Sequence, residues 1–291
     1  MSRLRHGFRL RQAYGGQVGA QESWGRISAL SEKDARELIR NPGAILPPLM
    51  MVFGSLFPAF LVAIGAPMIA GRTLEESGDF ADESAQAIAM LPELAGLAGN
   101  ALIQAFLFHQ FALLLLLVPV VAATSLATHA VIGEKHAKAL EPLLATPIST
   151  IELLIAKTLT PFVFALALTW FAAGLYVAGI LALGEPGVWR ALLGTRMVIL
   201  FGILGPLVEL ATLQVSVIVS SRAHDARSAQ QLTSLIILPI TAVFIAQLMG
   251  AFIVSPASLL LGALGCLIVN GLLLTIGVRV FARESILTRW R

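Results

Sequence analysis

The chain has 291 residues, of which 57% are hydrophobic and only 13% are charged, and its formal net charge is +3. Soluble globular domains contain about 45–50% apolar and about 25% charged residues, so this composition excludes an ordinary soluble domain and indicates a membrane protein. The excess of Lys and Arg follows the pattern of membrane orientation described below and gives no reason to expect a nucleic-acid partner.

An amphipathic helix is expected at residues 25–41, lying on the inner surface of the membrane. Ser31 and Asp34 have capping-box spacing at its start. Leu38 belongs to the apolar face that would contact the lipid. The helix should end at Asn41, because a residue that precedes proline disfavours the helical conformation.

Uncharged runs long enough to cross a bilayer, which takes about 20 mostly apolar residues, follow this helix, and a further run, 197–221, is interrupted only by Glu209. The last run is too long for one helix and is divided at Ser255, which precedes Pro256. We therefore expect an all-α integral membrane protein, with a transmembrane domain over residues 42–291. Its six spans are expected at about 44–68, 105–131, 149–182, 196–220, 235–253 and 257–280.

The distribution of Lys and Arg predicts how the spans are oriented, because cytoplasmic flanks carry the excess of basic residues. Of the 20 such residues, Arg72, Arg190 and Arg196 fall on one side, and the other 17 fall on the side of the termini. Both termini are therefore expected in the cytoplasm, residues 1–24 as a mobile tail. The acidic loop 71–93 is expected outside. The expected location is the plasma membrane, which in bacteria is the inner membrane.

The stretch 134–157, "EKHAKALEPLLATPISTIELLIAK", is unusually polar for its place between two apolar spans. Ser149 and Glu152 form a capping box, so the third span should start at Ser149. Glu134 and Lys138 have the i, i+4 spacing of a helical ion pair. Leu140, Leu143 and Leu144 fall on one side of a helical turn, with Glu141 among them. The pattern predicts short cytoplasmic helices that present leucines and charges together.

No motif for catalysis, metal binding or nucleotide binding occurs in the sequence. We find no His-Glu-x-x-His, no Gly-x-Ser-x-Gly, no Cys or His cluster at metal spacing, and no Gly-x-x-x-x-Gly-Lys-Ser/Thr. We therefore expect no catalytic residue, no metal ligand and no cofactor-binding residue in this chain, which is not expected to be an enzyme.

Glu209 lies near the middle of the fourth span, where an ionisable side chain is expensive and is a candidate functional residue. His109 lies similarly near the start of the second span. Two interpretations of Glu209 stay open: a structural residue hydrogen-bonded within the bundle, or a residue that handles substrate or protons. The two residues together form a candidate intramembrane polar site.

The run "GEKHAKALEPLLATPISTIELLIAK" resembles the signature of ABC type-2 permeases, the membrane subunits of ATP-binding-cassette exporters. The entry helix, the stretch "SSRAHDARSAQQLTSLIILP" and the tail "FARESILTRW" extend the resemblance over essentially the whole chain. The sequence departs from the family at Ala137, Lys138 and Ala139, and the turn "VSPA" is too short for a pair of outer re-entrant helices. The matching residues are Gly133, Glu134, Lys135, Leu140, Glu141, Leu143, Leu144, Thr146, Pro147, Ser149, Glu152 and Lys157.

This resemblance implies a function, a docking site and partners. The loop between spans two and three would form a coupling helix that docks on a separate nucleotide-binding subunit. That subunit would bind and hydrolyse the ATP that drives transport. A second permease copy, identical or different, would complete the translocation path. The docking residues would be Glu134, Lys138, Leu140, Glu141, Leu143 and Leu144.

Two other classes of protein stay open at the level of sequence. An ion-coupled secondary transporter would need more intramembrane charges than Glu209 and helices broken at corresponding places in two halves. A membrane-embedded enzyme would need a convergent set of reactive side chains. The sequence leaves the substrate open among drugs, lipids, peptides, polysaccharides and ions.

Overall fold

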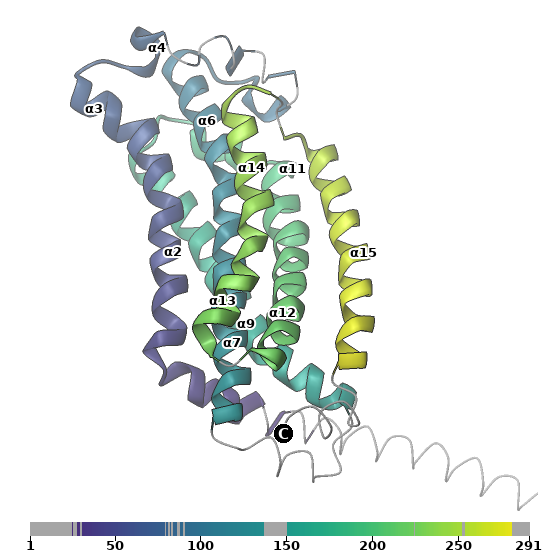
Figure 1. Cartoon of the computed structure of the whole chain (residues 1–291). Coiled ribbons are helices and arrows are strands. Elements are labelled where there is room, and N and C mark those ends of the chain that lie inside the picture. Colours follow the sequence, from purple (N-terminus) through teal and green to yellow (C-terminus); the bar gives the residue numbers. More distant parts are fainter. Residues whose placement is uncertain are drawn as a thin grey trace, which may run out of the picture.

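A computed structural model describes residues 25, 28–29, 31–78, 80, 82, 84–85, 88–89, 91–136, 150–223, 225–251 and 254–280. Every regular element in this part of the chain is a helix (Figure 1). Six helical stretches are long and apolar enough to cross a membrane. The prediction of an all-α membrane protein with six spans is therefore confirmed.

Most of the spans are assembled from several consecutive helical elements. Span 1 comprises α2 (Pro42–Phe60), η1 (Leu61–Gly65) and α3 (Ala66–Ala70). Span 2 comprises α6 (Gly99–Phe111), η3 (Ala112–Leu116) and α7 (Leu117–His136), and span 3 is α9 (Thr150–Leu183). Span 4 comprises α11 (Thr195–Ile199), η4 (Leu200–Leu204) and α12 (Gly205–Arg222). Span 5 comprises α13 (Ala226–Thr233), η5 (Ser234–Ile236) and α14 (Ile237–Leu248), and span 6 is α15 (Pro256–Val280).

Short helices occupy the connections at one end of the bundle, which we call the α4 end (Figure 1). They are α4 (Leu74–Ser77), η2 (Pro92–Leu94) and α10 (Val188–Leu192). The end of α7 and the start of α9 lie at the other end of the bundle, which we call the α7–α9 end. The start of α2 and the end of α15 lie there too, as an even number of spans requires.

Span 2 lies at the centre of the bundle. Its α7 segment packs against α2, α9 and α12. An aromatic trio joins it to its neighbours, because Phe108 lies 5.3 Å from Phe60 and 5.7 Å from Tyr176 between ring centroids. The hydroxyl of Tyr176 also donates a hydrogen bond of 2.6 Å to the carbonyl oxygen of Phe108. This trio locks spans 1, 2 and 3 together.

Prolines account for the two π-helical segments. Pro67 and Pro206 each follow such a segment near the start of a new α-helix, where their missing N–H is tolerated. Because Pro67 donates no hydrogen bond, the carbonyl of Ala63 four residues earlier is free. The side-chain amide of Gln104 donates to that oxygen at 3.3 Å. The break in span 1 thus becomes a contact with span 2.

Two amide side chains hold the α4 end together. Asn100 accepts a hydrogen bond from the backbone of Leu74 at 3.0 Å and donates one to Glu185 at 2.9 Å. Gln104 accepts one from the backbone of Glu185 at 2.6 Å. The starts of α4 and α6 are therefore fixed to the connection after α9.

The helix before span 1 differs in detail from the sequence prediction. Residues 28–29 are already helical and the hydroxyl of Ser31 has no hydrogen-bond partner in the described structure, so the predicted capping box at Ser31 is wrong. Asn41 does end this helix, and its side chain caps α2 by accepting from the backbone of Gly43 at 3.0 Å. Leu38 is buried against the bundle with Ala44 rather than exposed to lipid.

The connection between α14 and α15 is residues 249–255 only. Pro256 begins α15, as expected from the proline rule, and the hydroxyl of Ser255 accepts from the backbone of Ser258 at 3.3 Å. A connection this short has no room for a pair of re-entrant helices, in agreement with the expectation from the sequence.

Candidate functional sites in the membrane domain

The structure describes only the two ends of the predicted docking segment. Glu134 belongs to the last turn of α7, and α9 begins at Thr150. The other five predicted docking residues, Lys138, Leu140, Glu141, Leu143 and Leu144, lie outside the described residues. The end of α7 and the start of α9 both lie at the α7–α9 end of the bundle. Because the segment between them is not described, the docking role remains a prediction.

Glu209 is fully buried on α12. Neither of its carboxylate oxygens makes a well-formed hydrogen bond to any described residue, although the backbone of Leu166 on α9 is close enough to act on the carboxyl group. Thr212 and Ser216 follow it on the same face of α12 and are also fully buried. Their hydroxyls donate to backbone carbonyls of their own helix, so they leave the Glu209 carboxylate unsatisfied.

His109 is fully buried on α6 of span 2, whereas Glu209 lies on α12 of span 4. Its Nε2 contacts the carbonyl oxygen of Ala191 at 3.2 Å, and its Nδ1 has no partner within the described part of the chain. No hydrogen bond or ion pair joins His109 to Glu209 among the described residues. The structure therefore gives no direct contact between the two residues, and their role as a candidate intramembrane polar site remains a prediction.

A polar cluster near His109 is built around Arg196, which is 1% exposed. Its guanidinium donates to the side-chain oxygen of Gln247 at 3.4 Å, and Gln247 in turn donates to the carbonyl oxygen of Gln110 at 3.2 Å. His109 lies within electrostatic reach of the Arg196 charge. We call Arg196, Gln247, Gln110 and His109 the α4-end cluster.

Sequence reasoning missed Arg196 because it stands at the start of span 4 and was assigned to a solvated flank. The structure shows that the backbone of Thr195 donates to Glu93 of η2 at 3.1 Å. This contact holds the loop that carries Glu93 over the start of span 4, where the next residue, Arg196, is buried. The missing information was the path of the loop, which the sequence does not encode locally.

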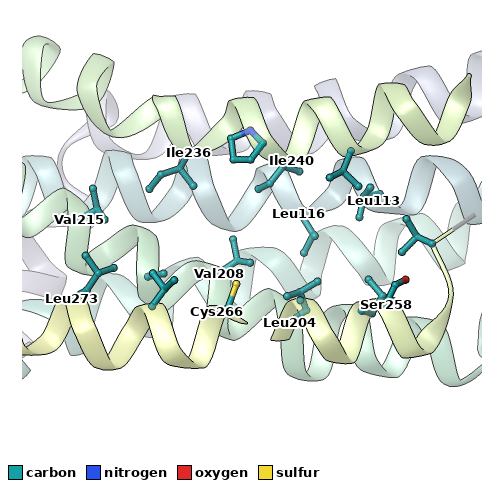
Figure 2. Close-up of a pocket in the computed structure, with 17 residues that line it drawn as sticks. Leu113, Leu116, Leu204, Val208, Val215, Ile236, Ile240, Ser258, Cys266 and Leu273 are labelled. Atoms are coloured by element: carbon teal, nitrogen blue, oxygen red, sulfur yellow. The ribbon is translucent and has the colours of Figure 1, made fainter. Parts of the chain in front are cut away.

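An apolar cleft of about 640 Å³ lies between spans 2, 4, 5 and 6. Figure 2 shows Ile236 and Ile240 on one side of the cleft and Ser258, Cys266 and Leu273 of α15 on the other. Ser258 and Cys266 are the only lining residues with a heteroatom in the side chain. The full lining is Leu113, Leu116, Leu204, Val208, Ala211, Val215, Ile236, Pro239, Ile240, Val243, Val254, Ser258, Leu259, Gly262, Cys266, Val269 and Leu273.

Six helices that are long and apolar enough to cross a bilayer indicate a multi-pass membrane protein, and its buried polar side chains are candidates for a functional role. The family model for the ABC-2 family transporter protein matches residues 28–282. The chain therefore belongs to the ABC-2 family of transporters, as the resemblance predicted, and it is an ABC permease subunit. Searches for similar curated proteins and similar solved structures gave no match.

Membership in this family implies association with an ABC ATPase subunit. The family consists of membrane components of transporters, which are generally not catalytic themselves. It also favours ATP-driven transport over the ion-coupled transporter and the membrane-embedded enzyme that the sequence left open.

Proposed function

We propose that this chain is the permease subunit of an ABC exporter in the plasma membrane, driven by ATP that a separate nucleotide-binding subunit hydrolyses. The family match, which includes the whole six-span bundle, is the observation that carries the proposal. The lack of a phosphate-binding Gly-x-x-x-x-Gly-Lys-Ser/Thr loop in the sequence also supports it. ATP is bound by the partner, and this chain holds no cofactor.

The ATPase docks on the connection between α7 and α9, with Leu140, Leu143 and Leu144 packing in its cleft and Glu134, Lys138 and Glu141 around the rim. The fold supports this assignment because the connection joins two long helices directly. The α7 helix also packs against α2 and α12. A push on the connection therefore reaches four of the six spans through continuous packed contacts.

The α7–α9 end faces the cytoplasm, and the α4 end faces outward. The distribution of basic residues supports this orientation. A cysteine in place of exposed Ala95 should react with an impermeant thiol reagent added to intact cells, whereas one in place of exposed Arg227 should not. Both variants need the Cys266→Ser background, because Cys266 is the only native cysteine. The reverse labelling pattern would overturn the orientation.

A second permease copy, identical or different, completes the translocation path. Exposed apolar side chains on α2 and α9, such as Phe53, Phe57, Trp170 and Phe171, suit either lipid or a second copy as their neighbour.

Removing the leucines tests the docking assignment. If Leu143 and Leu144 fill a pocket on the ATPase, the double variant Leu143→Ala/Leu144→Ala loses on the order of 2–5 kcal/mol of docking free energy. Co-purification of the ATPase should then fail. Ser149→Ala is the matched control, because it removes one helix cap worth about 1 kcal/mol and should leave assembly intact while lowering transport per ATP. Normal assembly and transport by the double variant would reduce the segment to a simple connector.

A further inference from the structure

Three of the spans that line the apolar cleft, spans 2, 4 and 5, also carry the residues of the α4-end cluster. In each of these spans, one polar residue of the cluster lies one or two helical turns closer to the α4 end than a residue that lines the cleft. Residues spaced by three, four or seven positions share one face of a helix, and the π-helical turn η4 makes a spacing of eight equivalent to about seven. The polar and lining pairs are Gln110 with Leu113, Gln247 with Val243, and Arg196 with Leu204.

The cluster contains a buried positive charge that forms no ion pair with a described residue. Arginine stays protonated in proteins, and a buried charge without a partner costs several kcal/mol. The ion pairs found between described residues join Lys33 to Glu37 and Arg36 to Glu32, and none includes Arg196. Glu93 acts on Arg196 electrostatically without forming an ion pair with it. One of its carboxylate oxygens accepts from the backbone of Thr195, and the other is buried without a hydrogen-bond partner in the described structure.

Several polar atoms of the cluster are ready for a ligand. The Nε and Nη1 atoms of Arg196, the Nδ1 of His109 and the side-chain oxygen of Gln110 are buried without a partner in the described structure. The guanidinium group offers its N–H donors in a planar fork that fits carboxylate and phosphate oxygens. Only the two Arg196 atoms are donors, because the Gln110 oxygen accepts and the Nδ1 of a neutral His109 accepts when its Nε2 donates to Ala191. An anionic group with several oxygens is therefore the ligand that matches the Arg196 donors.

The cleft next to the cluster has the length and chemistry of a hydrocarbon chain. On α15 its lining runs from Ser258 to Leu273, a distance of about 22 Å at the helical rise of about 1.5 Å per residue. This is most of the hydrocarbon core of a bilayer, which is about 30 Å thick. Figure 1 shows α14 and α15 as separate helices, which do not pack against each other along their length. Val243 of α14 and Val269 of α15 both line the cleft and are 40% and 46% exposed, so the cleft is open between these two helices.

We propose that the cleft binds a hydrocarbon chain of an anionic amphiphile, and that Arg196 binds the charged head group through its Nε and Nη1 atoms, while Gln247 holds the guanidinium in place. The chain would enter from the bilayer between α14 and α15, with its head group at the α4 end. This rests on the proposed function in one respect, since it identifies the bound amphiphile as the class of molecule transported.

Photo-crosslinking to the purified full-length chain tests this without the ATPase. The chain is placed in nanodiscs of phosphatidylcholine with a trace of phosphatidic acid that carries a diazirine in one acyl chain. Diacylglycerol with the same diazirine chain is the matched neutral probe, because it lacks the phosphate group. We expect the anionic probe to label cleft residues such as Val208 and Gly262 about tenfold more than the neutral probe, the difference that one charge-assisted hydrogen bond makes. Labelling of Leu267, which is exposed outside the cleft, should not depend on the head group.

Two variants separate the head-group site from the cleft. Arg196→Gln should reduce cleft labelling by the anionic probe to the level of the neutral probe. Gly262→Leu fills the cleft without disturbing the cluster, since a Cβ there meets only Leu204 Cδ1, at 3.9 Å, and it should abolish cleft labelling by both probes. Gly271→Leu is the matched control, because Gly271 lies on the opposite face of α15 with open space around it. It should label like the parent.

Equal labelling of the cleft by both probes, or labelling that persists in Gly262→Leu, would overturn the proposal. The proposal would also be overturned if neither probe labelled the cleft in the parent chain until the oligomer was dissociated. A second copy of the chain would then be the occupant of the cleft. Adding phosphatidic acid to the complex with its ATPase should raise ATP hydrolysis in the parent and not in Arg196→Gln. Binding without this stimulation would identify a resident lipid and reject a transported class. Failure to find an ATPase would instead count against the proposed function alone.

Discussion

Spans 2 and 6 have nearly equal hydropathy, yet they occupy opposite environments. In span 2, 89% of the most apolar window is buried inside the protein, compared with 17% in span 6. In a membrane, lipid and protein interior are both apolar, so hydropathy identifies a span without telling which neighbours it has. The difference lies instead in what each helix contacts. Span 2 carries aromatic and hydrogen-bonding partners for spans 1, 3 and 5, whereas span 6 presents leucines outward and lines the cleft with its inner face.

The largest expected effect separates these two spans directly. Phe108→Ala removes a fully buried ring from the aromatic trio and should lower the free energy of unfolding by about 3–5 kcal/mol, because it leaves a cavity. Leu267→Ala on α15 removes a side chain that is 56% exposed and should change it by less than about 0.5 kcal/mol. Unfolding in mixed micelles with increasing sodium dodecyl sulfate measures both. Equal losses would show that the two spans are equally packed.

A glycine pair tests the same contrast within span 3. A Cβ at Gly179 would lie 2.5 Å from Phe60 Cζ, whereas one at Gly174 meets nothing within 4 Å. Gly179→Ala should therefore destabilise the protein by about 1–3 kcal/mol through overpacking of the aromatic trio. Gly174→Ala should be neutral or slightly stabilising, since alanine favours the helix. The same micelle titration decides the matter, and a harmless Gly179→Ala would mean that Phe60 is free to move.

Removing one hydroxyl from the trio should have a smaller effect. Tyr176→Phe keeps the ring and loses the hydrogen bond to the carbonyl of Phe108, worth about 0.5–1.5 kcal/mol. The cost stays modest because the Phe108 carbonyl also accepts from the backbone of Ala112 within the helix. A loss as large as that of Phe108→Ala would show that the hydroxyl, rather than ring packing, holds spans 2 and 3 together.

The smallest expected effect concerns the exposed start of span 5. Asp225 caps α13 by accepting from the backbone N–H of Ser228 at 2.8 Å and from its hydroxyl at 2.7 Å, and these bonds hold the pKa of Asp225 below its ordinary value. The cap is therefore fully present above the unfolded pKa of about 3.9 and is lost as the pH falls through the lower folded value.

Hydrogen exchange at the Ser228 amide measures this cap. Protection, after correction for intrinsic exchange, should fall on acidification below pH of about 4 in the parent chain. It should be independent of pH in Asp225→Asn, because asparagine caps helices but does not titrate. The same pH dependence in both chains would assign the effect to another group.

The sequence was sufficient for features that depend on local chemistry. Long apolar runs with few or no charged residues identified six spans, and Pro256 marked the start of the sixth. It was insufficient for features that depend on packing between distant segments. Ser31 has a capping-box pattern but lies inside a helix, and Arg196 has the pattern of a flanking residue but is buried by the loop that carries Glu93. The apolar cleft has no pattern of its own, because its lining is as apolar as the lipid-facing surface.

ATP hydrolysis by material purified from native membranes through a tag on this chain tests the central claim, that the chain is a permease powered by a separate subunit. The account predicts that an ABC ATPase co-purifies and that all hydrolysis follows that subunit, so the chain stripped of its partner hydrolyses no ATP. Hydrolysis by the stripped chain, or transport-competent material without an ATPase, would contradict it.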